Sequence, residues 1–316
     1  MNKKAFIFPG QGSQETKMGL DLYENFDSAK KIFNALNETL GFSLTDIMWK
    51  SSTDELTKTQ NAQPAIVAVS YAAFKALEDA GIKPDAVAGH SIGEYSALTC
   101  SGVISFEDAV RLVRKRGLLM QECSEKHFGS MAAVMGLEED KIEEVLSGLR
   151  NDGIIEVANI NSDNQIVISG ESRLIDEALE PLKAKGAKRA VKLNVAGAFH
   201  SPLMKDANVK LAEEIDKIKF SDPVCPVYVN VTAQKMTDFN EIKKVLKKQI
   251  ISKVQWNKLI KNMVSDGINE FVEAGNGSVL SGLVKRIAPS GLCCQMNSRE
   301  SFEKIKNIYS GSRICS

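Results

Sequence analysis

The chain has 316 residues, of which 43% are hydrophobic and 25% charged, a composition typical of a globular protein with room for two hydrophobic cores. Its 40 basic residues balance its 40 acidic residues, so no bulk charge favours nucleic acid or an anionic membrane as a partner. No apolar run reaches the ~18 residues of a membrane span, and the opening "MNKKAFIFPG" is too short in apolar residues for a signal peptide. We therefore expect a cytoplasmic protein.

The metal-ligating residue types are sparse. The six cysteines form no C-x-x-C pair, which indicates reduced thiols in a chain of this length. The three histidines, His90, His127 and His200, are too far apart in sequence to form a helical metal pair. We expect no bound metal.

Strands and helices alternate in the first part of the chain. The patterns predict strands over 3–8 and 85–90, and helices over 62–81, 92–102 and 105–123. Pro64 suits the first turn of its helix, and Ser105 suits the N-cap of the last one. This alternation predicts an α/β fold with a largely parallel sheet.

The middle of the chain has a different order of elements. Strands are predicted at 130–136, 154–160, 165–170 and 188–195, with helices at 138–150 and 171–186. That βαββαβ order is ferredoxin-like. It predicts a small subdomain over 128–196, inserted into a larger, discontinuous one made of 1–127 and 197–316. We expect the polar tail after about residue 297 to be loosely held.

One short segment, "AVAGHSIGEYSALT" at residues 86–99, carries a candidate nucleophile. Ser91 lies in a G-x-S-x-G pattern between a predicted buried strand and a predicted helix, which is the arrangement of a nucleophile elbow. In so sharp a turn, side chains two residues before and after the serine would collide with neighbouring backbone. The other readings are a plain tight turn and a helix cap.

A serine nucleophile needs a base. His90 adjoins Ser91, but successive side chains on such a turn point apart, so we interpret His90 as structural support. His127 lies in the polar stretch "CSEKHFGS", which favours a surface position. His200, in "NVAGAFHSPLM", remains as the candidate base, and a structural histidine is the alternative.

Arg116 is the candidate binding residue. At about 100° per residue it lies at the centre of the apolar face of its helix. A buried guanidinium must be paired, either by an internal Asp or Glu or by the carboxylate of a ligand.

The loop "FPGQGSQ" at residues 8–14 lacks the third glycine and the lysine of nucleotide-binding loops. It is expected beside the serine, where its N–H groups could complete an oxyanion hole. The alternative is a simple turn at the end of a strand.

Five ordered motifs, "FIFPGQGSQ", "GHSIGEYSAL", "RKRGLLMQE", "AGAFHSPLM" and "EAGNGSVLSGLVKRI", together resemble the malonyl-CoA:acyl carrier protein transacylases of bacterial fatty acid synthesis. The resemblance spans nearly the whole chain. It implies an α/β-hydrolase-like large subdomain beside the ferredoxin-like insert.

The resemblance also assigns roles to residues. It implies Ser91 as the nucleophile, His200 as its general base and Gln249 as the residue whose backbone carbonyl orients the histidine. The remaining implied roles are an oxyanion hole from the backbone N–H groups of Gln11 and Ile92, a malonate carboxylate held by Arg116, and malonyl selectivity at Phe199. The stretch around His127 matches no family pattern, which leaves that histidine unassigned.

The implied reaction is ping-pong transfer from malonyl-CoA to holo acyl carrier protein through a malonyl-serine, without cofactor or metal. Acyl carrier proteins are acidic, so Lys188, Arg189 and Arg286 are candidate docking residues, with ordinary surface charge as the alternative. Three rivals remain: a polyketide synthase acyltransferase, a serine hydrolase or thioesterase, and a non-catalytic carrier-binding module. Hydrolases of this motif usually place their histidine late in the chain, whereas no histidine follows His200 here.

Overall fold

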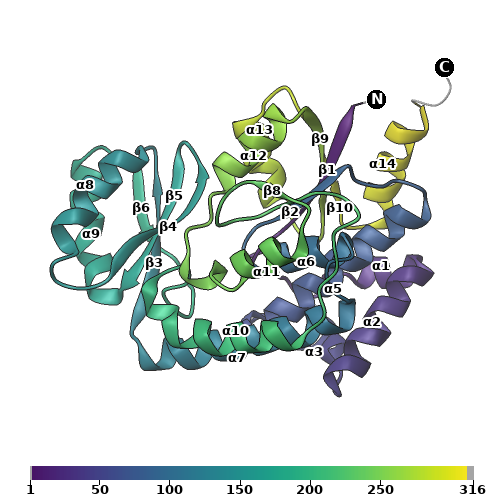
Figure 1. Ribbon diagram of the computed structural model, residues 1–316, viewed down its shortest axis with the longest axis horizontal. Helices are drawn as coiled ribbons and strands as arrows, with labels where there is room; N and C mark the ends of the chain where they lie inside the picture. The colour runs from purple at the N-terminus through teal and green to yellow at the C-terminus, as the bar shows by residue number, and fades with distance from the viewer. Residues whose placement is uncertain (1, 312–316) are drawn as a thin grey trace.

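A computed structural model describes residues 2–311 and contains two sheets (Figure 1). The larger sheet has the strand order β10-β9-β1-β2-β7-β8. All of its strand pairs are parallel except β7 with β8. Its strands are β1 (Lys3–Phe8), β2 (Ala86–Gly89), β7 (Val227–Tyr228), β8 (Lys235–Met236), β9 (Ile268–Ala274) and β10 (Leu292–Met296). The predicted α/β class with a largely parallel sheet is confirmed.

Both faces of the larger sheet are covered, because successive residues of its central strand enter different cores. Phe6 and Phe8 of β1 belong to one hydrophobic cluster, while Ala5 and Ile7 belong to another. The first cluster includes residues of α2 (Asp27–Leu40), α5 (Thr59–Asp79), α6 (Gly93–Cys100), α7 (Phe106–Lys126), α10 (Lys205–Lys217) and α11 (Phe239–Leu246). The second includes residues of α12 (Trp256–Ser265) and α13 (Val279–Ile287).

Short elements complete this part of the molecule. They are α1 (Leu20–Asn25), α3 (Leu44–Lys50), α4 (Thr53–Thr57), and the 3-10 turns η1 (Pro202–Met204) and η2 (Gln249–Ile251). Ser105 caps α7 as expected, since its side chain accepts a hydrogen bond from the backbone N–H of Asp108 at 3.0 Å. Among the described residues, no helix has the length and apolar character to cross a membrane.

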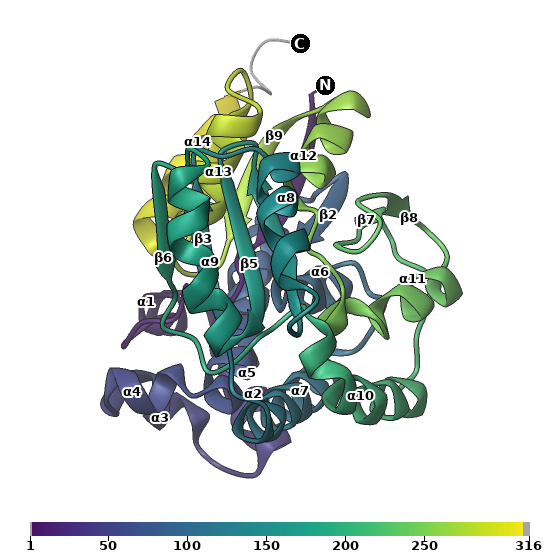
Figure 2. The ribbon, with the colours of Figure 1, turned by 90° about the vertical axis from the view of Figure 1, so that its left-hand side faces the viewer.

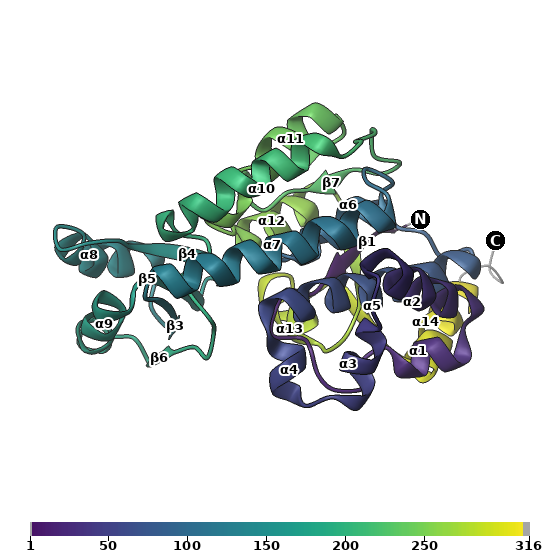
Figure 3. The ribbon, with the colours of Figure 1, turned by 90° about the horizontal axis from the view of Figure 1, so that it is seen from below.

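The smaller sheet is antiparallel, with strand order β4-β5-β3-β6. Its elements follow the chain order β3 (Gly129–Met135), α8 (Glu139–Leu149), β4 (Ile155–Ser162), β5 (Gln165–Glu171), α9 (Ser172–Ala184) and β6 (Arg189–Lys192). The observed order is the βαββαβ order that the sequence predicted. Helices α8 and α9 cover one face of this sheet, over a core of its own (Figure 2). Helix α7 runs toward this sheet and leads into β3 (Figure 3).

Two local expectations were wrong. Helix α5 begins at Thr59, so Pro64 lies inside the helix and not in its first turn. Proline has no N–H to donate to the carbonyl of Gln60, and Nη1 of Arg114 donates to that carbonyl instead, at 2.6 Å. This replacement lets the helix start earlier than the proline suggested.

The expectation of a loosely held tail was also wrong for residues 298–311, while 312–316 lie outside the described residues. The described part of the tail forms α14 (Arg299–Gly311), which buries Phe302 and Ile305 in the first core. A polar segment with two apolar residues three apart can hold one side of a helix against a core. Cys315, one of the cysteines expected to be reduced, lies outside the described residues; the other five are free thiols.

Candidate active site

The turn between β2 and α6 lifts Ser91 out of the sheet. Ser91 has φ 50°, a left-handed conformation that non-glycine residues rarely adopt. A Cβ atom at Gly89 would lie 1.9 Å from the carbonyl carbon of Gly93, and one at Gly93 would lie 2.1 Å from the carbonyl oxygen of Phe8. Both glycines are therefore required, because the chain on each side of the serine packs directly against other backbone atoms.

Asn230 fastens this turn from a distant part of the chain. Its side-chain oxygen accepts from the backbone N–H of Ser91 at 2.7 Å, and its side-chain nitrogen donates to the carbonyl of Gly89 at 2.6 Å. The backbone N–H of Asn230 in turn donates to Oε2 of Glu94 at 2.8 Å. Burial raises the pKa of Glu94 to about 7, and its Oε1 has no hydrogen-bond partner. Neither Asn230 nor Glu94 was predicted from the sequence as part of the site.

His200 lies within hydrogen-bond distance of the serine. Its Nε2 is 2.7 Å from Oγ of Ser91, and its Nδ1 lies 3.0 Å from the carbonyl of Gln249 and 3.1 Å from that of Ser252. Because carbonyls only accept, the proton of the neutral ring belongs on Nδ1, which leaves the Nε2 lone pair facing the serine hydroxyl. Burial, followed by the nearby positive charge of Arg116, lowers the pKa of His200 to about 3. The ring is therefore neutral at neutral pH, and its Nε2 acts as an acceptor.

In the described part of the chain, no carboxylate contacts His200; the two backbone carbonyls orient it instead. The arrangement that the family resemblance implied for Gln249 is present. Its side chain also contributes, since Nε2 of Gln249 donates to the carbonyl of Ser91 at 2.9 Å.

Arg116 of α7 is buried, with 1% of its surface exposed, and reaches the same serine. Its Nη2 lies 3.2 Å from Oγ of Ser91 and 3.3 Å from Oε1 of Gln249, and its guanidinium lies 5.6 Å from the centre of the Tyr95 ring. No ion pair to Arg116 is found within residues 2–311, and its Nε has no hydrogen-bond partner. Glu94 is near enough to stabilise the charge of Arg116 but forms no ion pair with it, so the internal partner that the sequence left open makes no direct contact and the guanidinium can still bind a carboxylate.

A cavity of about 250 Å³ opens in front of Ser91 and His200, between the two sheets. Gln11 and Phe199 line it together with residues of β3, β4 and β5. Within the described residues, the backbone N–H groups of Gln11 and Ile92 have no acceptor. Their N–H groups are thus available to an oxyanion, as the resemblance implied. Polar atoms of the wall come from Gln14, Thr57, Asn159, Asn161, Gln165 and Asn194.

The other two histidines lie as expected. The side chain of His90 is bonded to Asn161 and not to Ser91, with its Nε2 2.8 Å from Oδ1 of Asn161 and its ring against Trp256. His127 has 42% of its side chain exposed and lies 3.7 Å from Oδ2 of Asp206. His90 therefore supports the loop, and His127 lies outside the cavity.

The three candidate docking residues are exposed. Nη1 of Arg286 donates to Oε1 of Gln165 at 3.2 Å, and Gln165 lines the cavity. Met135 of β3 pairs with Gln165 on one side and with Arg189 on the other. Arg189 is therefore two strands, or roughly 10 Å, from Gln165, with Lys188 beside it.

Known proteins share both sequence and structure with this chain. A family model described as "Acyl transferase domain" matches residues 5–296. The malonyl CoA-acyl carrier protein transacylase of Bacillus subtilis (strain 168) is 44% identical over 288 residues, which is 91% of this chain and 91% of that protein. Among solved structures, the malonyl CoA-acyl carrier protein transacylase from Coxiella burnetii matches with TM-score 0.94 and 36% identity over 97% of each chain. A solved structure of a type II PKS acyl-carrier protein in complex with its malonyl-transacylase also matches, with TM-score 0.94 and 36% identity over 97% of this chain and 99% of the matched chain.

Proposed function

This chain belongs to the acyl transferase family, and we propose that it transfers the malonyl group of malonyl-CoA to the phosphopantetheine thiol of acyl carrier protein. It is an acyltransferase. The observation that carries the proposal is the convergence of His200 and Arg116 on one atom, Oγ of Ser91, at 2.7 and 3.2 Å. A base and a carboxylate-binding group beside one hydroxyl fit an acyl donor that carries a second, free carboxylate.

The first half-reaction forms a malonyl-serine. Nε2 of His200 takes the hydroxyl proton of Ser91 while Oγ bonds to the thioester carbon of malonyl-CoA. The negative charge moves to the carbonyl oxygen, where the backbone N–H groups of Gln11 and Ile92 stabilise it. The C–S bond then breaks, and His200 returns the proton to the sulfur of coenzyme A.

The second half-reaction reverses these steps with a different thiol. His200 takes the proton of the pantetheine thiol, the sulfur attacks the ester carbon, the C–O bond to Ser91 breaks, and His200 returns the proton to Oγ of Ser91. Through both halves Arg116 holds the free malonate carboxylate by paired, charge-assisted hydrogen bonds, and Phe199 borders the acyl group. One thioester replaces another, so the exchange requires no cofactor or metal.

The product is proposed to supply fatty acid synthesis. A polyketide pathway is the second candidate, because one similar solved structure is a transacylase in complex with a polyketide carrier protein. A cytoplasmic location stays a prediction. We also propose that residues 1–127 and 197–316 form an α/β-hydrolase-like unit and that residues 128–196 form a ferredoxin-like insert.

The test is a transfer assay with malonyl-CoA and purified holo acyl carrier protein, with the apo carrier as the control. Malonyl-holo carrier should accumulate with stoichiometric release of coenzyme A, and the apo carrier should remain unmodified. Coenzyme A release at the same rate without any carrier would favour a hydrolase. No release and no transfer would favour a non-catalytic carrier-binding module.

We propose that Lys188, Arg189 and Arg286 contact the acidic carrier. Their exposure and their positions relative to Gln165, which lines the cavity, support this assignment. Replacing all three by Glu should raise KM for the carrier at least about tenfold and leave KM for malonyl-CoA unchanged. An unchanged KM for the carrier would refute this assignment.

A further inference from the structure

The two carbonyls that orient His200 lie on one short segment, residues 249–254. The end of this segment is bonded to the smaller sheet. The backbone N–H of Val254 donates to the carbonyl of Ala158 at 2.8 Å, and the N–H of Ile160 donates to the carbonyl of Val254 at 2.9 Å. The support of the histidine is thus continuous with strand β4.

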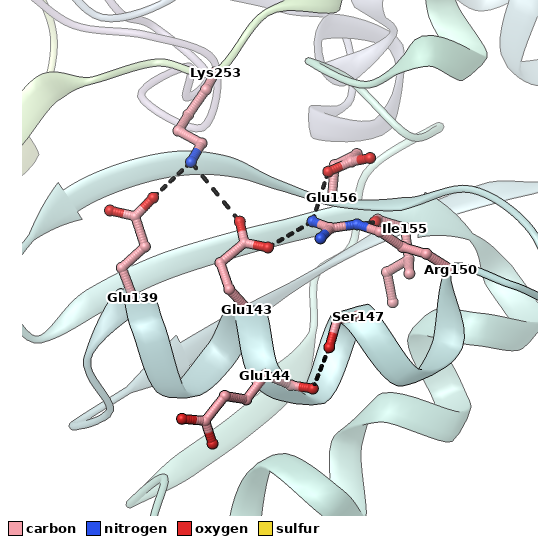
Figure 4. A network of polar contacts seen from close by, with 8 residues as sticks. All are labelled: Glu139, Glu143, Glu144, Ser147, Arg150, Ile155, Glu156 and Lys253. Atoms are coloured by element: carbon pink, nitrogen blue, oxygen red, sulfur yellow. Dashed lines mark hydrogen bonds and ion pairs between the residues drawn. The ribbon is translucent and has the colours of Figure 1, made fainter.

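Lys253 adds a second attachment between the same segment and the smaller part. Its Nζ lies 2.5 Å from Oε1 of Glu139 and 3.9 Å from Oε1 of Glu143, both on helix α8 (Figure 4). With 32% of its side chain exposed, Lys253 is less open to solvent than most lysines that form ion pairs in this protein. Solvent and salt therefore screen its ion pairs less than they screen pairs on the open surface.

Arg150 ties helix α8 to strand β4. Its Nη2 lies 2.6 Å from Oε2 of Glu143 and 2.7 Å from Oε2 of Glu156, and its Nε donates to the carbonyl of Ile155 at 3.1 Å (Figure 4). Helix α8 and strand β4 are therefore bonded into one unit through this side chain. Lys253 and Val254 attach the histidine's support to both members of that unit.

We propose that Lys253 is a positioning residue for His200: its ion pairs with Glu139 and Glu143 hold the segment that presents the Gln249 and Ser252 carbonyls to the imidazole. The inference rests on the proposed function, because it matters only if His200 is the base for Ser91. A displaced carbonyl would let the ring turn, and a misplacement of about 1 Å at a base can cost a large part of the rate.

A second lysine offers a matched control. Nζ of Lys261 on α12 pairs with both carboxylate oxygens of Asp163, at 2.7 and 2.9 Å, and Asp163 lies in the turn between β4 and β5. This pair also joins the larger part to the smaller one. Lys261 lies in helix α12, outside the 249–254 segment that carries the carbonyls at His200.

The experiment measures single-turnover acylation of Ser91 by malonyl-CoA in the full-length protein. Lys253→Met should slow acylation about three- to tenfold, with KM for malonyl-CoA within about twofold of the parent value. Lys253→Arg should keep the parent rate. Lys261→Met should also keep it, while lowering Tm by an amount similar to that of Lys253→Met.

A glutamate variant separates pairing from the charge of the lysine. Glu139→Gln, which removes the shorter ion pair of Lys253 and leaves the Arg150–Glu143 pair intact, should slow acylation as Lys253→Met does, and combining the two changes should add no further loss. Lys253→Met acylating as fast as Lys261→Met would overturn the positioning role. A parent protein that forms no malonyl-serine would instead overturn the proposed function, and this inference with it.

Discussion

Arg116→Ala tests how the protein selects a dicarboxylic acyl group. The guanidinium is buried, lies 3.2 Å from Oγ of Ser91, and has no ion pair within the described residues. A malonyl carboxylate at this position forms a buried charge pair, and removing one side of such a pair costs about 3–5 kcal/mol. We expect kcat/KM for malonyl transfer to fall by about a hundredfold to several thousandfold.

The same change should leave acetyl transfer nearly intact, because an acetyl group has no carboxylate for Arg116 to hold. The neighbouring Glu94 is not left as an unpaired charge, since burial already raises its pKa to about 7 and it can take up a proton. The assay compares kcat/KM for malonyl-CoA and acetyl-CoA with one carrier protein. The ratio of acetyl to malonyl transfer should rise at least about hundredfold.

Arg114→Ala is the matched control. Arg114 lies on the same helix and donates to the carbonyl of Gln60 and to Oδ1 of Asn61. Neither hydrogen bond involves Ser91. Loss of the Arg114 side chain should reduce Tm but not the preference for malonyl. Comparable losses for both acyl groups in Arg116→Ala would refute the carboxylate-binding role.

Three further predictions follow from the site. Because burial and Arg116 lower the pKa of His200 to about 3, the ring stays neutral on acidification, and the acylation rate should be constant from about pH 8 to about pH 5; a fall centred near pH 6.5 would contradict this. Between about pH 6.5 and about pH 3 the unfolded chain binds a proton at this histidine and the folded chain does not. The contribution of His200 to the free energy of unfolding is therefore complete above about pH 6.5 and declines as the pH falls toward 3. Asn230→Ala removes the bonds to Ser91 and Gly89, and should lower kcat at least about tenfold and Tm by several degrees; a parent-like kcat would show that the glycines alone hold the turn. Prolonged dialysis against EDTA should leave the transfer rate unchanged, whereas a loss that added divalent metal restores would refute the absence of a metal requirement.

Arg116 shows which features of the site can be predicted from the sequence and which cannot. Helical periodicity alone placed it at the centre of a buried face, and its burial is confirmed. Periodicity could not choose between an internal partner and a ligand, because that choice depends on what other segments bring to the guanidinium. Folding brings Gln249 and Ser91 within hydrogen-bond distance of the Arg116 guanidinium, and the sequence alone does not show this.

The support of the serine was not predictable in the same way. Asn230 lies 139 residues after Ser91 in the sequence and follows a two-residue strand, so neither spacing nor periodicity marks it. Glu94 lies within the motif that was analysed, but acidic residues are common in the first turn of a helix, so nothing in the sequence marked it as buried. In the structure Glu94 is buried and accepts a hydrogen bond from the backbone N–H of Asn230, which is distant in the sequence.

Element boundaries failed where tertiary contacts override local preference. Pro64 predicted a helix start that Arg114 moves upstream, by bonding the carbonyl the proline leaves without a donor. The polar composition of the tail outweighed two apolar residues that bury themselves in the core as part of α14. In both cases the decisive partner lies far away in the sequence.

The most direct test of the central claim is the intact mass of the protein after brief exposure to malonyl-CoA, measured beside Ser91→Ala and again after addition of holo acyl carrier protein. We expect one malonyl group on the parent protein, none on Ser91→Ala, and complete transfer of the malonyl group from the parent protein to the carrier. An adduct on Ser91→Ala, or an adduct on the parent that the carrier cannot remove, would contradict transfer through a malonyl-serine.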